Sequence, residues 1–395
     1  MTLAPPRATH VHAARTPDEL RERIPSWEGL ALNALEPNVW YEPFLLVPAI
    51  EELGRQEAVV TLFISGPGGE LIGVFPLQRL LGSFAVPAPH YSMWKHPYCY
   101  LCTPLLRPGA EMLALGAVFG WLTTHGRETP LQFRLHPADG PFDRVLRRFL
   151  LQTGRRMHTT LCYDRGAIAT SLPYDDYVQA NVAAKKRKQS RRLWRRLGER
   201  GRVRVERART EDEVDGAVEQ FLALEHSGWK GQRGTSFASN QRDQAFLRVA
   251  MRAGAVDGRV EIWSLTLDDA PIAMAIVLRA LAVVYTFKIA YDEAFALYSP
   301  GVQLDLAMVA GLLAEPGVEL IDSCADPGYA LHDSHWGERR AIRVGTVVRG
   351  SIVGRAVGQA GVQGEAASRG LRACLAESSP EVQGALRRVR RVLAR

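Results

Sequence analysis

The sequence lacks the features that define several classes of protein. Its 395 residues include only five cysteines, an odd and widely spread set that cannot form the framework of a small disulfide-stabilised protein. Cys99 and Cys102 form a lone CxxC, whereas a zinc site needs a second pair of ligands at a suitable spacing. We therefore expect structural thiols, no metal site and a reducing compartment.

Long apolar runs are missing as well. No uninterrupted apolar run reaches the ~18 residues that span a membrane, and the longest, 273–285, is broken by Arg279. The first residues carry prolines where a signal peptide has its apolar segment. These absences predict a cytoplasmic protein with no transmembrane segment.

Positive charge is concentrated in one segment. The net charge is +7, but residues 185–207 hold twelve Lys and Arg against two Glu, so the rest of the chain sums to −3. The basic helix expected at 185–196 is read first as a solvated face, and second as a docking site for an acidic partner such as a carrier protein, an anionic surface or tRNA. No nucleic-acid-binding motif accompanies it, so nucleic acid is not the expected partner.

The pattern of apolar residues predicts two α/β units. The first has strands at 58–64 and 71–77 around a Gly-rich turn, then helix 110–124, strand 131–135 and helix 142–153. The second has helices at 174–198, 211–228 and 244–253, strands at 259–267, 273–281 and 283–291, helix 302–313, and strands at 318–324 and 343–348. Such alternation is typical of an α/β sandwich.

The expected organisation has four parts. Residues 1–35 form an irregular lead-in with one short helix near 17–23, 36–172 form the first half, 173–354 form the second half, and 355–395 form a basic helical tail. The two halves share a loose order of elements without an obvious sequence repeat, so the duplication is a hypothesis.

The most informative stretch runs from Val283 to Leu304 as a strand, a loop and a helix. Ser299, Pro300 and Gly301 stand at the start of that helix as N-cap, first residue and first-turn glycine. Free backbone N–H groups and the positive end of the helix dipole at such a start suit a pyrophosphate. Taken alone, the same pattern is also that of an ordinary helix cap.

A family resemblance favours the anion-site interpretation of this stretch over an ordinary helix cap. Lys288-Ile-Ala-Tyr-Asp292, followed after six residues by Ser299-Pro-Gly301 and a helix, resembles the cofactor strand and loop of the GNAT-like acyltransferases associated with cellulose biosynthesis, the CelD/BcsL type. The FemAB-like enzymes, with two GNAT-like halves, are relatives of that type. Further similar stretches are 225–236 with its Trp229-Lys230, 258–273, the basic helix 185–196, 38–44 and 102–105. The resemblance covers about residues 35–348.

This resemblance implies an α/β fold of two tandem GNAT-like halves with mixed central sheets flanked by helices, and an acyl-CoA site in the second half. Pantetheine would lie in a gap between strands 283–291 and 318–324, and a backbone N–H near Ile289 or Ala290 would stabilise the thioester oxyanion. The implied cofactor-binding residues are Ile289, Ala290, Tyr291, Tyr298, Ser299, Pro300, Gly301, Val302 and Gln303. Gly301 is the only glycine of a loop that usually reads Arg/Gln-x-x-Gly-x-Gly/Ala, so the donor stays open among acetyl-CoA, a longer acyl-CoA and a carrier-protein thioester.

Four side chains are candidates for catalysis. Asp322, Asp326 and His332 lie on or just beyond strand 318–324, where the acceptor would arrive, and His332 titrates near neutral pH. Asp322 has a structural acid as its alternative, and His332 a surface-loop histidine. Lys288, inside an apolar strand, needs an acidic partner or a phosphate, with a snorkelling edge lysine as the alternative.

The acceptor pocket has its own candidates, which are Trp229, Lys230, His90, Tyr91 and Trp336. The alternatives are buried core tryptophans and, for the segment around His90, an irregular loop packed on the sheet. The predicted function is transfer of an acyl group from acyl-CoA, acetyl-CoA first, to an amine or hydroxyl of a small-molecule, glycan or peptide acceptor. The alternatives are an aminoacyl-tRNA- or carrier-protein-dependent transferase of FemAB-like type and an inert GNAT-like binding scaffold.

Overall fold

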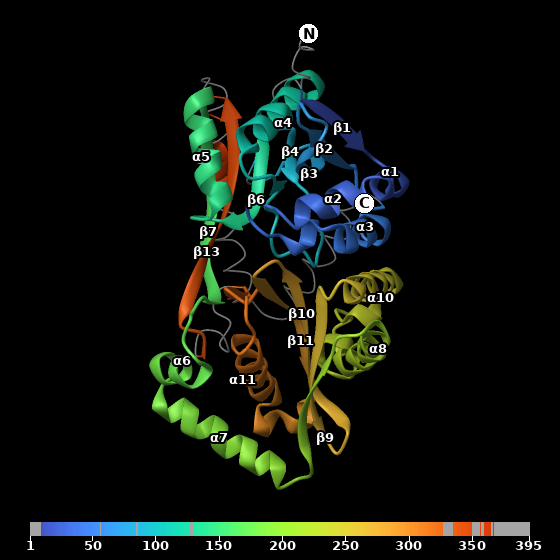
Figure 1. Cartoon of the computed structure of the whole chain (residues 1–395), viewed down its shortest axis with the longest axis vertical. Coiled ribbons are helices and arrows are strands. Elements are labelled where there is room, and N and C mark those ends of the chain that lie inside the picture. The colour runs from blue at the N-terminus through green and yellow to red at the C-terminus, as the bar shows by residue number, and fades with distance from the viewer. Residues whose placement is uncertain are drawn as a thin grey trace, which may run out of the picture.

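The computed structural model describes residues 9–55, 57–83, 86–126, 129–326 and 335–349, together with 356, 359–364 and 366. Figure 1 shows an elongated molecule with the N-terminal elements at one end, residues 174–313 at the other, and two long strands running along one side. His332 and most of the predicted tail lie outside the described residues.

A single mixed sheet of thirteen strands runs through the described part of the molecule. Its order is β1-β2-β3-β4-β6-β13-β7-β12-β11-β10-β9-β8, and β5 pairs with β3. The strands of the first part are β1 (His10–Ala14), β2 (Val59–Ser65), β3 (Leu71–Leu80), β4 (His90–Met93), β5 (Leu105–Leu106), β6 (Leu131–Pro137) and β7 (Arg155–Ile168). The later strands are β8 (Val203–Ala208), β9 (Val260–Leu267), β10 (Ala270–Ala280), β11 (Val283–Tyr291), β12 (Leu320–Asp322) and β13 (Glu338–Arg349).

Helices cover both faces of this sheet (Figure 1). The first part has α1 (Pro17–Arg21), α2 (Ile24–Ala31), α3 (Pro43–Glu52), α4 (Glu111–Gly126), α5 (Pro141–Thr153) and the 3₁₀ turn η1 (Val39–Tyr41). The second part has α6 (Tyr174–Asn181), α7 (Ala184–Gly198), α8 (Glu211–Ser227), α9 (Trp229–Gln232), α10 (Gln241–Val256) and α11 (Pro300–Leu313), with 3₁₀ turns η2 (Phe237–Ser239) and η3 (Glu293–Tyr298). No described helix has the length and apolar character needed to cross a membrane.

Three local expectations need correction. Residues 10–31 are not irregular, since they form β1, α1 and α2. The helix expected over 174–198 is two helices, because Val182 and Ala183 are extended and end α6. Ser299 does not cap α11 with its side chain; it adopts a left-handed conformation (φ 53°), and its carbonyl accepts the first N–H groups of the helix.

Strand β13 joins the two parts. It was expected to complete the second half, but it lies between β6 and β7 and pairs with both. The end of β7 in turn pairs with β12 through Ile168 and Ile321. A boundary near residue 172 therefore separates the chain in sequence without separating the sheet, and strands from both halves hold one another in register.

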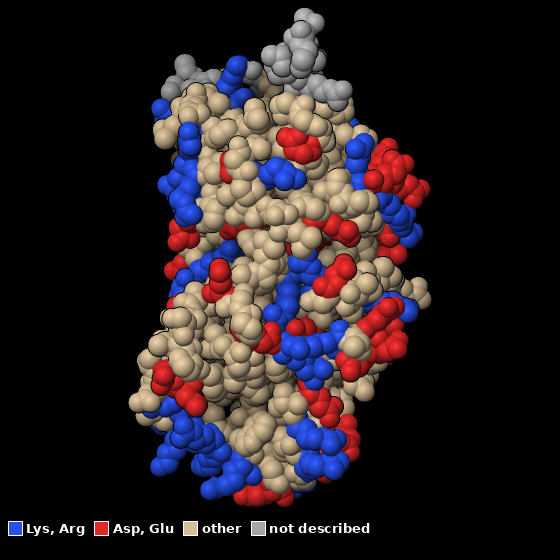
Figure 2. Space-filling view, viewed as in Figure 1, with Lys and Arg blue, Asp and Glu red and all other residues tan. Residues whose placement is uncertain are grey.

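A dense group of cations lies on the surface over α7 (Figure 2). Lys and Arg gather over α7 at the lower left, next to acidic residues of α6. The predicted basic helix is therefore present and faces solvent, with only Leu193 and Leu197 buried beneath it.

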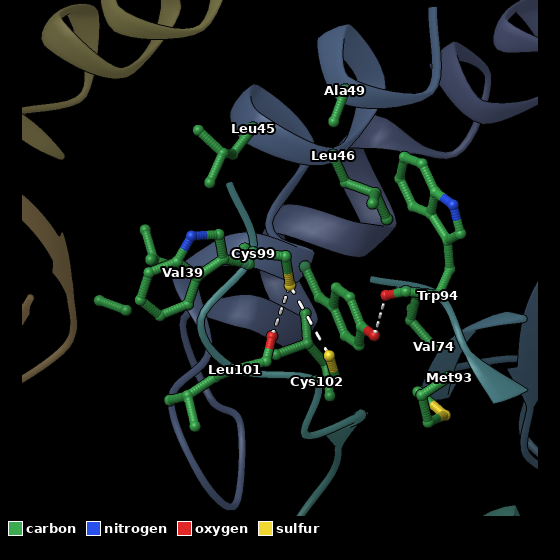
Figure 3. Close-up of a cluster of buried hydrophobic side chains, with 14 of the residues drawn as sticks. Val39, Leu45, Leu46, Ala49, Val74, Met93, Trp94, Cys99, Leu101 and Cys102 are labelled. Carbon is green, nitrogen blue, oxygen red and sulfur yellow. Dashed lines mark hydrogen bonds between the residues drawn. The ribbon is translucent and has the colours of Figure 1, made fainter. Parts of the chain in front are cut away.

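Cys99 and Cys102 belong to the core of the first part (Figure 3). Both are fully buried, their sulfur atoms lie 3.7 Å apart, and the Cys99 thiol donates to the carbonyl of Leu101 at 2.9 Å. Within the described chain, no group of three or more His, Cys, Asp or Glu side chains is placed to hold a metal ion. Cys99 and Cys102 are surrounded by apolar side chains such as Leu45 and Val74.

Candidate functional site

Strands β11 and β12 diverge where the site forms. Strand β12 pairs in parallel only with residues 283–285 of β11, although β11 continues to Tyr291. On its other side, β11 pairs with β10 through a register shift that leaves Phe287 without an opposite residue. Such a bulge bends a strand and increases its twist. The second half of β11 therefore leaves one edge unpaired.

A cavity of about 360 Å³ occupies this divergence. Its walls come from β11, from the chain that follows β12, and from helices on opposite faces of the sheet, α8 and α9 on one and α11 on the other (Figure 1). The lining includes residues 286–291 and 323–326, Glu225, Trp229 and Lys230 on the α8 side, Asp305 and Met308 on α11, and Tyr100 from the first part. The unpaired edge of β11 thus faces a cavity that is bounded by helices on both faces of the sheet.

Lys288 is a partly buried residue whose ammonium lies within this cavity. Its Nζ donates to the hydroxyl of Tyr100 at 2.7 Å and lies 4.9–5.6 Å from the ring centroids of Tyr98, Tyr100, Phe237 and Phe287. Burial lowers the pKa of Lys288 to about 8, and the ammonium of Lys230 acts in the same direction. The described residues place no carboxylate within ion-pair distance of it. The aromatic rings hold the cation in place without neutralising it.

Lys230 lies on the same side of the cavity but is neutralised. Its Nζ donates to Glu225 Oε1 at 2.7 Å and to the carbonyl of Ile289 at 3.3 Å. The other oxygen of Glu225 accepts the N–H of Phe237 at 2.8 Å. Because the N–H and C=O of one strand residue point to the same side, the contact to Ile289 shows that its N–H also faces the open edge. Of the two predicted oxyanion donors, Ile289 is the one with this orientation.

The loop before α11 offers few free backbone donors. Ser299 N–H donates to the carbonyl of Ala296, Val302 N–H and Gln303 N–H donate to the carbonyl of Ser299, and Pro300 has no N–H. Gly301 N–H has no recorded acceptor among the described residues. A Cβ on Gly301 would stand 3.6 Å from Tyr291 and 3.7 Å from Ile289, so its α-carbon faces the end of β11.

Asp322 does not line the cavity. Its side chain is fully buried and accepts Arg165 and Arg340 at 2.7 Å each. Burial acts to raise the pKa of Asp322, but the two guanidinium groups outweigh it and hold the pKa below its usual value. Arg340 also pairs with Glu36 at 3.2 Å. The prediction of a proton acceptor here is therefore not supported, because a doubly paired carboxylate is a poor base.

Of the remaining predicted site residues, some line the cavity and others lie outside it. Asp326 and Trp229 line the cavity, and Trp229 is half-exposed at its mouth. His90 and Tyr91 are buried in β4 and are not part of the lining. The Nδ1–H of His90 donates to the carbonyl of Ala88 at 2.8 Å, and burial lowers the pKa of His90. Trp336 is buried behind the cavity rather than in its wall.

Several lining residues were not predicted from the sequence, and three of them make polar contacts that shape the cavity. Tyr100 carries the hydroxyl that binds Lys288, and Glu225 carries the carboxylate that binds Lys230. Asp305 of α11 accepts the indole N–H of Trp336 at 3.0 Å, and burial raises its pKa to about 7. An acidic residue on the apolar face of the 302–313 helix was the one signal that the sequence contained.

Comparisons with known proteins agree with this geometry. Residues 184–332 match the family model described as an acetyltransferase (GNAT) domain. No curated protein matches the chain. Among solved structures, FemX is 13% identical, with 84% of this chain and 96% of that chain covered at a TM-score of 0.53.

Two further solved structures are similar over most of their length. A conserved protein of unknown function from Bacteroides thetaiotaomicron is 8% identical over 85% of this chain and 99% of its own, with a TM-score of 0.54. A C-terminal domain (DUF2156) attributed to a lysylphosphatidylglycerol synthetase of Agrobacterium fabrum is 10% identical over 86% and 94%, with a TM-score of 0.51. The chain has a GNAT-like α/β fold. At these identities the structural matches show the fold alone, and the finer resemblance to the CelD/BcsL type stays a prediction.

Proposed function

We propose that this GNAT-like protein transfers an acyl group from a pantetheine thioester, with acetyl-CoA as the simplest donor, to an amine or hydroxyl of an acceptor. The observation that carries the proposal is the cavity at the divergence of β11 and β12, with one edge of β11 unpaired and helices on both faces. An unpaired strand edge binds an amide-containing chain by strand-like hydrogen bonds. Pantetheine is such a chain.

The two faces of the cavity suit two substrates. The α11 side, with Asp305, Met308 and the free N–H of Gly301, suits the donor. The α8 side, with Lys230, Glu225 and the half-exposed Trp229, suits a polar acceptor. In this arrangement the acceptor meets the thioester carbonyl beside Ile289.

The chemistry requires stabilisation of the oxyanion that forms when the acceptor attacks. The N–H of Ile289 is one donor, and the ammonium of Lys288 supplies a positive charge within a poorly hydrated site, where electrostatic stabilisation is strongest. Asp326, at the open end of the cavity, is the proposed proton acceptor for the attacking amine. The carbon–sulfur bond then breaks, and the proton reaches the departing thiolate.

A thiol-release assay tests this proposal. Wild-type protein is mixed with acetyl-CoA and a panel of primary amines, amino acids and amino sugars, and free thiol is measured with a chromogenic disulfide. We expect acceptor-dependent release that falls by about 10²-fold in a Lys288→Met variant. Absence of release with every acceptor, or release that is unchanged in the variant, would contradict the proposal.

An aminoacyl-tRNA donor is the second candidate. The observations that favour it are the scarcity of free backbone N–H groups before α11 and the exposed cations of α7 beside that loop. Such a donor would bind with a steep dependence on salt, because several phosphates are neutralised. Salt-sensitive binding of tRNA together with no binding of acetyl-CoA would favour it over the first.

A further inference from the structure

Helix α7 presents an exposed cationic face. Seven of its Lys and Arg side chains face solvent; these are Lys185, Lys186, Lys188, Arg191, Arg192, Arg195 and Arg196. Arg187 differs, since its guanidinium donates to the carbonyls of Gln179 and Val182 at the end of α6. This contact fixes the corner between the two helices and leaves the other cations on a rigid support.

These cations are not neutralised within the described chain. The one ion pair recorded for the seven is Arg195 with Glu199 at 3.9 Å, between side chains that are both more than 60% exposed. An exposed pair of this kind contributes little. The helix thus offers most of its charge to a partner.

The cationic face is also short. Beyond α7, Arg202 and Arg204 pair with Asp269, and Arg207 pairs with glutamates of the sheet and of the segment after α11. At the other end, α6 has two exposed aspartates in its first turn. Among the described residues of this region, the unpaired charge is therefore limited to α7, a helix of 15 residues about 22 Å long, and to Arg200 just beyond it. A long polyanion would extend beyond this face and meet the acidic turn of α6.

Helix α7 lies beside the loop that leads to the cavity. The side-chain amide of Gln303 in α11 donates to the carbonyl of Ser190 in α7 at 3.1 Å. Next to this contact, η3 exposes Leu297 by 85%, and α7 itself exposes Trp194 by 37%. Figure 2 shows the cations of α7 at the lower left of the molecule. A mixture of cations and exposed apolar side chains is typical of protein interfaces.

We propose that α7 docks a small acidic carrier protein that delivers its acyl group as a phosphopantetheine thioester into the cavity between β11 and β12. The charge of α7 complements such a partner, and its length matches one helix-sized contact. The scarcity of free N–H groups before α11 is consistent with a donor whose pantetheine arm enters without a nucleotide. The inference rests on the proposed function, because the thioester that the carrier delivers is the acyl donor of the proposed reaction. The acyl carbon forms a bond to the acceptor nitrogen, its bond to sulfur breaks, and the amine proton passes to the pantetheine thiolate.

A binding experiment with the full chain tests the docking. The probe is a bacterial acyl carrier protein in its acetylated holo form, labelled with a fluorophore and followed by anisotropy at low and moderate salt. The test variant reverses three outward charges of α7, K188E/R192E/R195E. The control variant reverses three scattered exposed cations that have no recorded side-chain partner, R79E/R148E/R242E, so both variants change the net charge equally. Acetyl-pantetheine, which has neither carrier nor nucleotide, is titrated separately.

We expect the wild type and the control variant to bind the carrier within twofold of each other, and the α7 variant to bind on the order of tenfold or more weakly, with the difference shrinking as salt increases. Acetyl-pantetheine should bind all three proteins equally. No binding by the wild type, equal weakening in both variants, or displacement of the carrier by tRNA at lower concentration would overturn the inference. Carrier binding through α7 with no binding of acetyl-pantetheine would leave the docking in place and contradict the proposed function instead.

Discussion

A single substitution of the partly buried Lys288 separates its effect on stability from its effect on activity. Replacing it with methionine removes the charge and keeps a similar side-chain volume. Lowering the pKa from 10.5 to about 8 means that keeping this group charged costs the folded state about 3 kcal/mol. The lost hydrogen bond to Tyr100 offsets about 1 kcal/mol of that. We therefore expect the Lys288→Met protein to be more stable than the wild type by about 2 kcal/mol at pH 7.

The gain should depend on pH in a defined direction. The folded-state pKa of Lys288 is lower than the unfolded one, so the unfolded chain binds more protons between pH ~8 and ~10.5. The penalty in the wild type is fully present below pH ~8 and disappears as the pH rises through the unfolded value. Chemical unfolding at pH 7 and pH 10 should therefore show the advantage of the variant shrinking with pH. Equal advantage at both pH values would refute the argument.

Two related variants complete the test. Lys230→Met removes the partner of a buried Glu225, so it should destabilise the protein, by about 3 kcal/mol or more, where Lys288→Met stabilises it. Lys288→Arg keeps the charge at every accessible pH. If the ammonium stabilises the oxyanion, the rate of thiol release in the wild type should fall above pH ~8 and that of the arginine variant should not. Parallel pH profiles would indicate that Lys288 acts only on structure.

Two other predictions concern the framework of the site. Arg340→Met leaves the buried Asp322 with one guanidinium fewer and should lower the free energy of unfolding by about 3 kcal/mol, measured by urea denaturation; a loss below 1 kcal/mol would mean that the network is dispensable. Gly311→Ala would place a methyl group against the indole of Trp263 and should destabilise the protein by about 1–3 kcal/mol. Gly116 lies on another helix with open space around it, so Gly116→Ala should stabilise the protein by up to about 1 kcal/mol. The same sign for both alanines would contradict the packing of α11 on β9.

The sequence predicted the local parts of the site well. Residues 283–313 were expected as strand, loop and helix, and they form β11, η3 and α11. Lys288 was identified because a lysine in an apolar strand needs a partner, and Lys230 because of the family resemblance. Both side chains line the cavity. These features depend on short-range patterns that a single sequence contains.

The partners of these residues could not be predicted in the same way. Tyr100 lies 188 residues before Lys288, and Arg165 lies 157 residues before Asp322. A carboxylate at the end of a strand has the same sequence pattern whether it is free or paired with arginines, so the sequence left both a base and a structural acid open for Asp322. Only the packing of the two parts decides between the two possibilities.

The position of β13 in the sheet could not be predicted from the sequence either, because it also depends on contacts between distant parts of the chain. The strand was predicted at 343–348 and is present at Glu338–Arg349. Its residue types favour a strand but do not specify the neighbouring strands, because strand propensity depends on the packing that the rest of the sheet provides. The structure places it between β6 and β7, more than 150 residues before it in the chain. Sequence patterns therefore predicted the strand but not its position in the sheet.

The most direct test of the account is a calorimetric titration of acetyl-CoA and longer acyl-CoAs into the wild type and three glycine variants. Gly301→Glu places a carboxylate over the end of β11, whereas Gly301→Ala meets ordinary contact distances there. Gly216→Glu adds the same charge on the exposed face of α8 and serves as the control. We predict binding by the wild type, by Gly301→Ala and by Gly216→Glu, and at least tenfold weaker binding by Gly301→Glu. No heat from any acyl-CoA would contradict acyl-CoA as the donor and leave a carrier-bound thioester in its place. Equal binding by Gly301→Glu would contradict a donor site between β11 and β12.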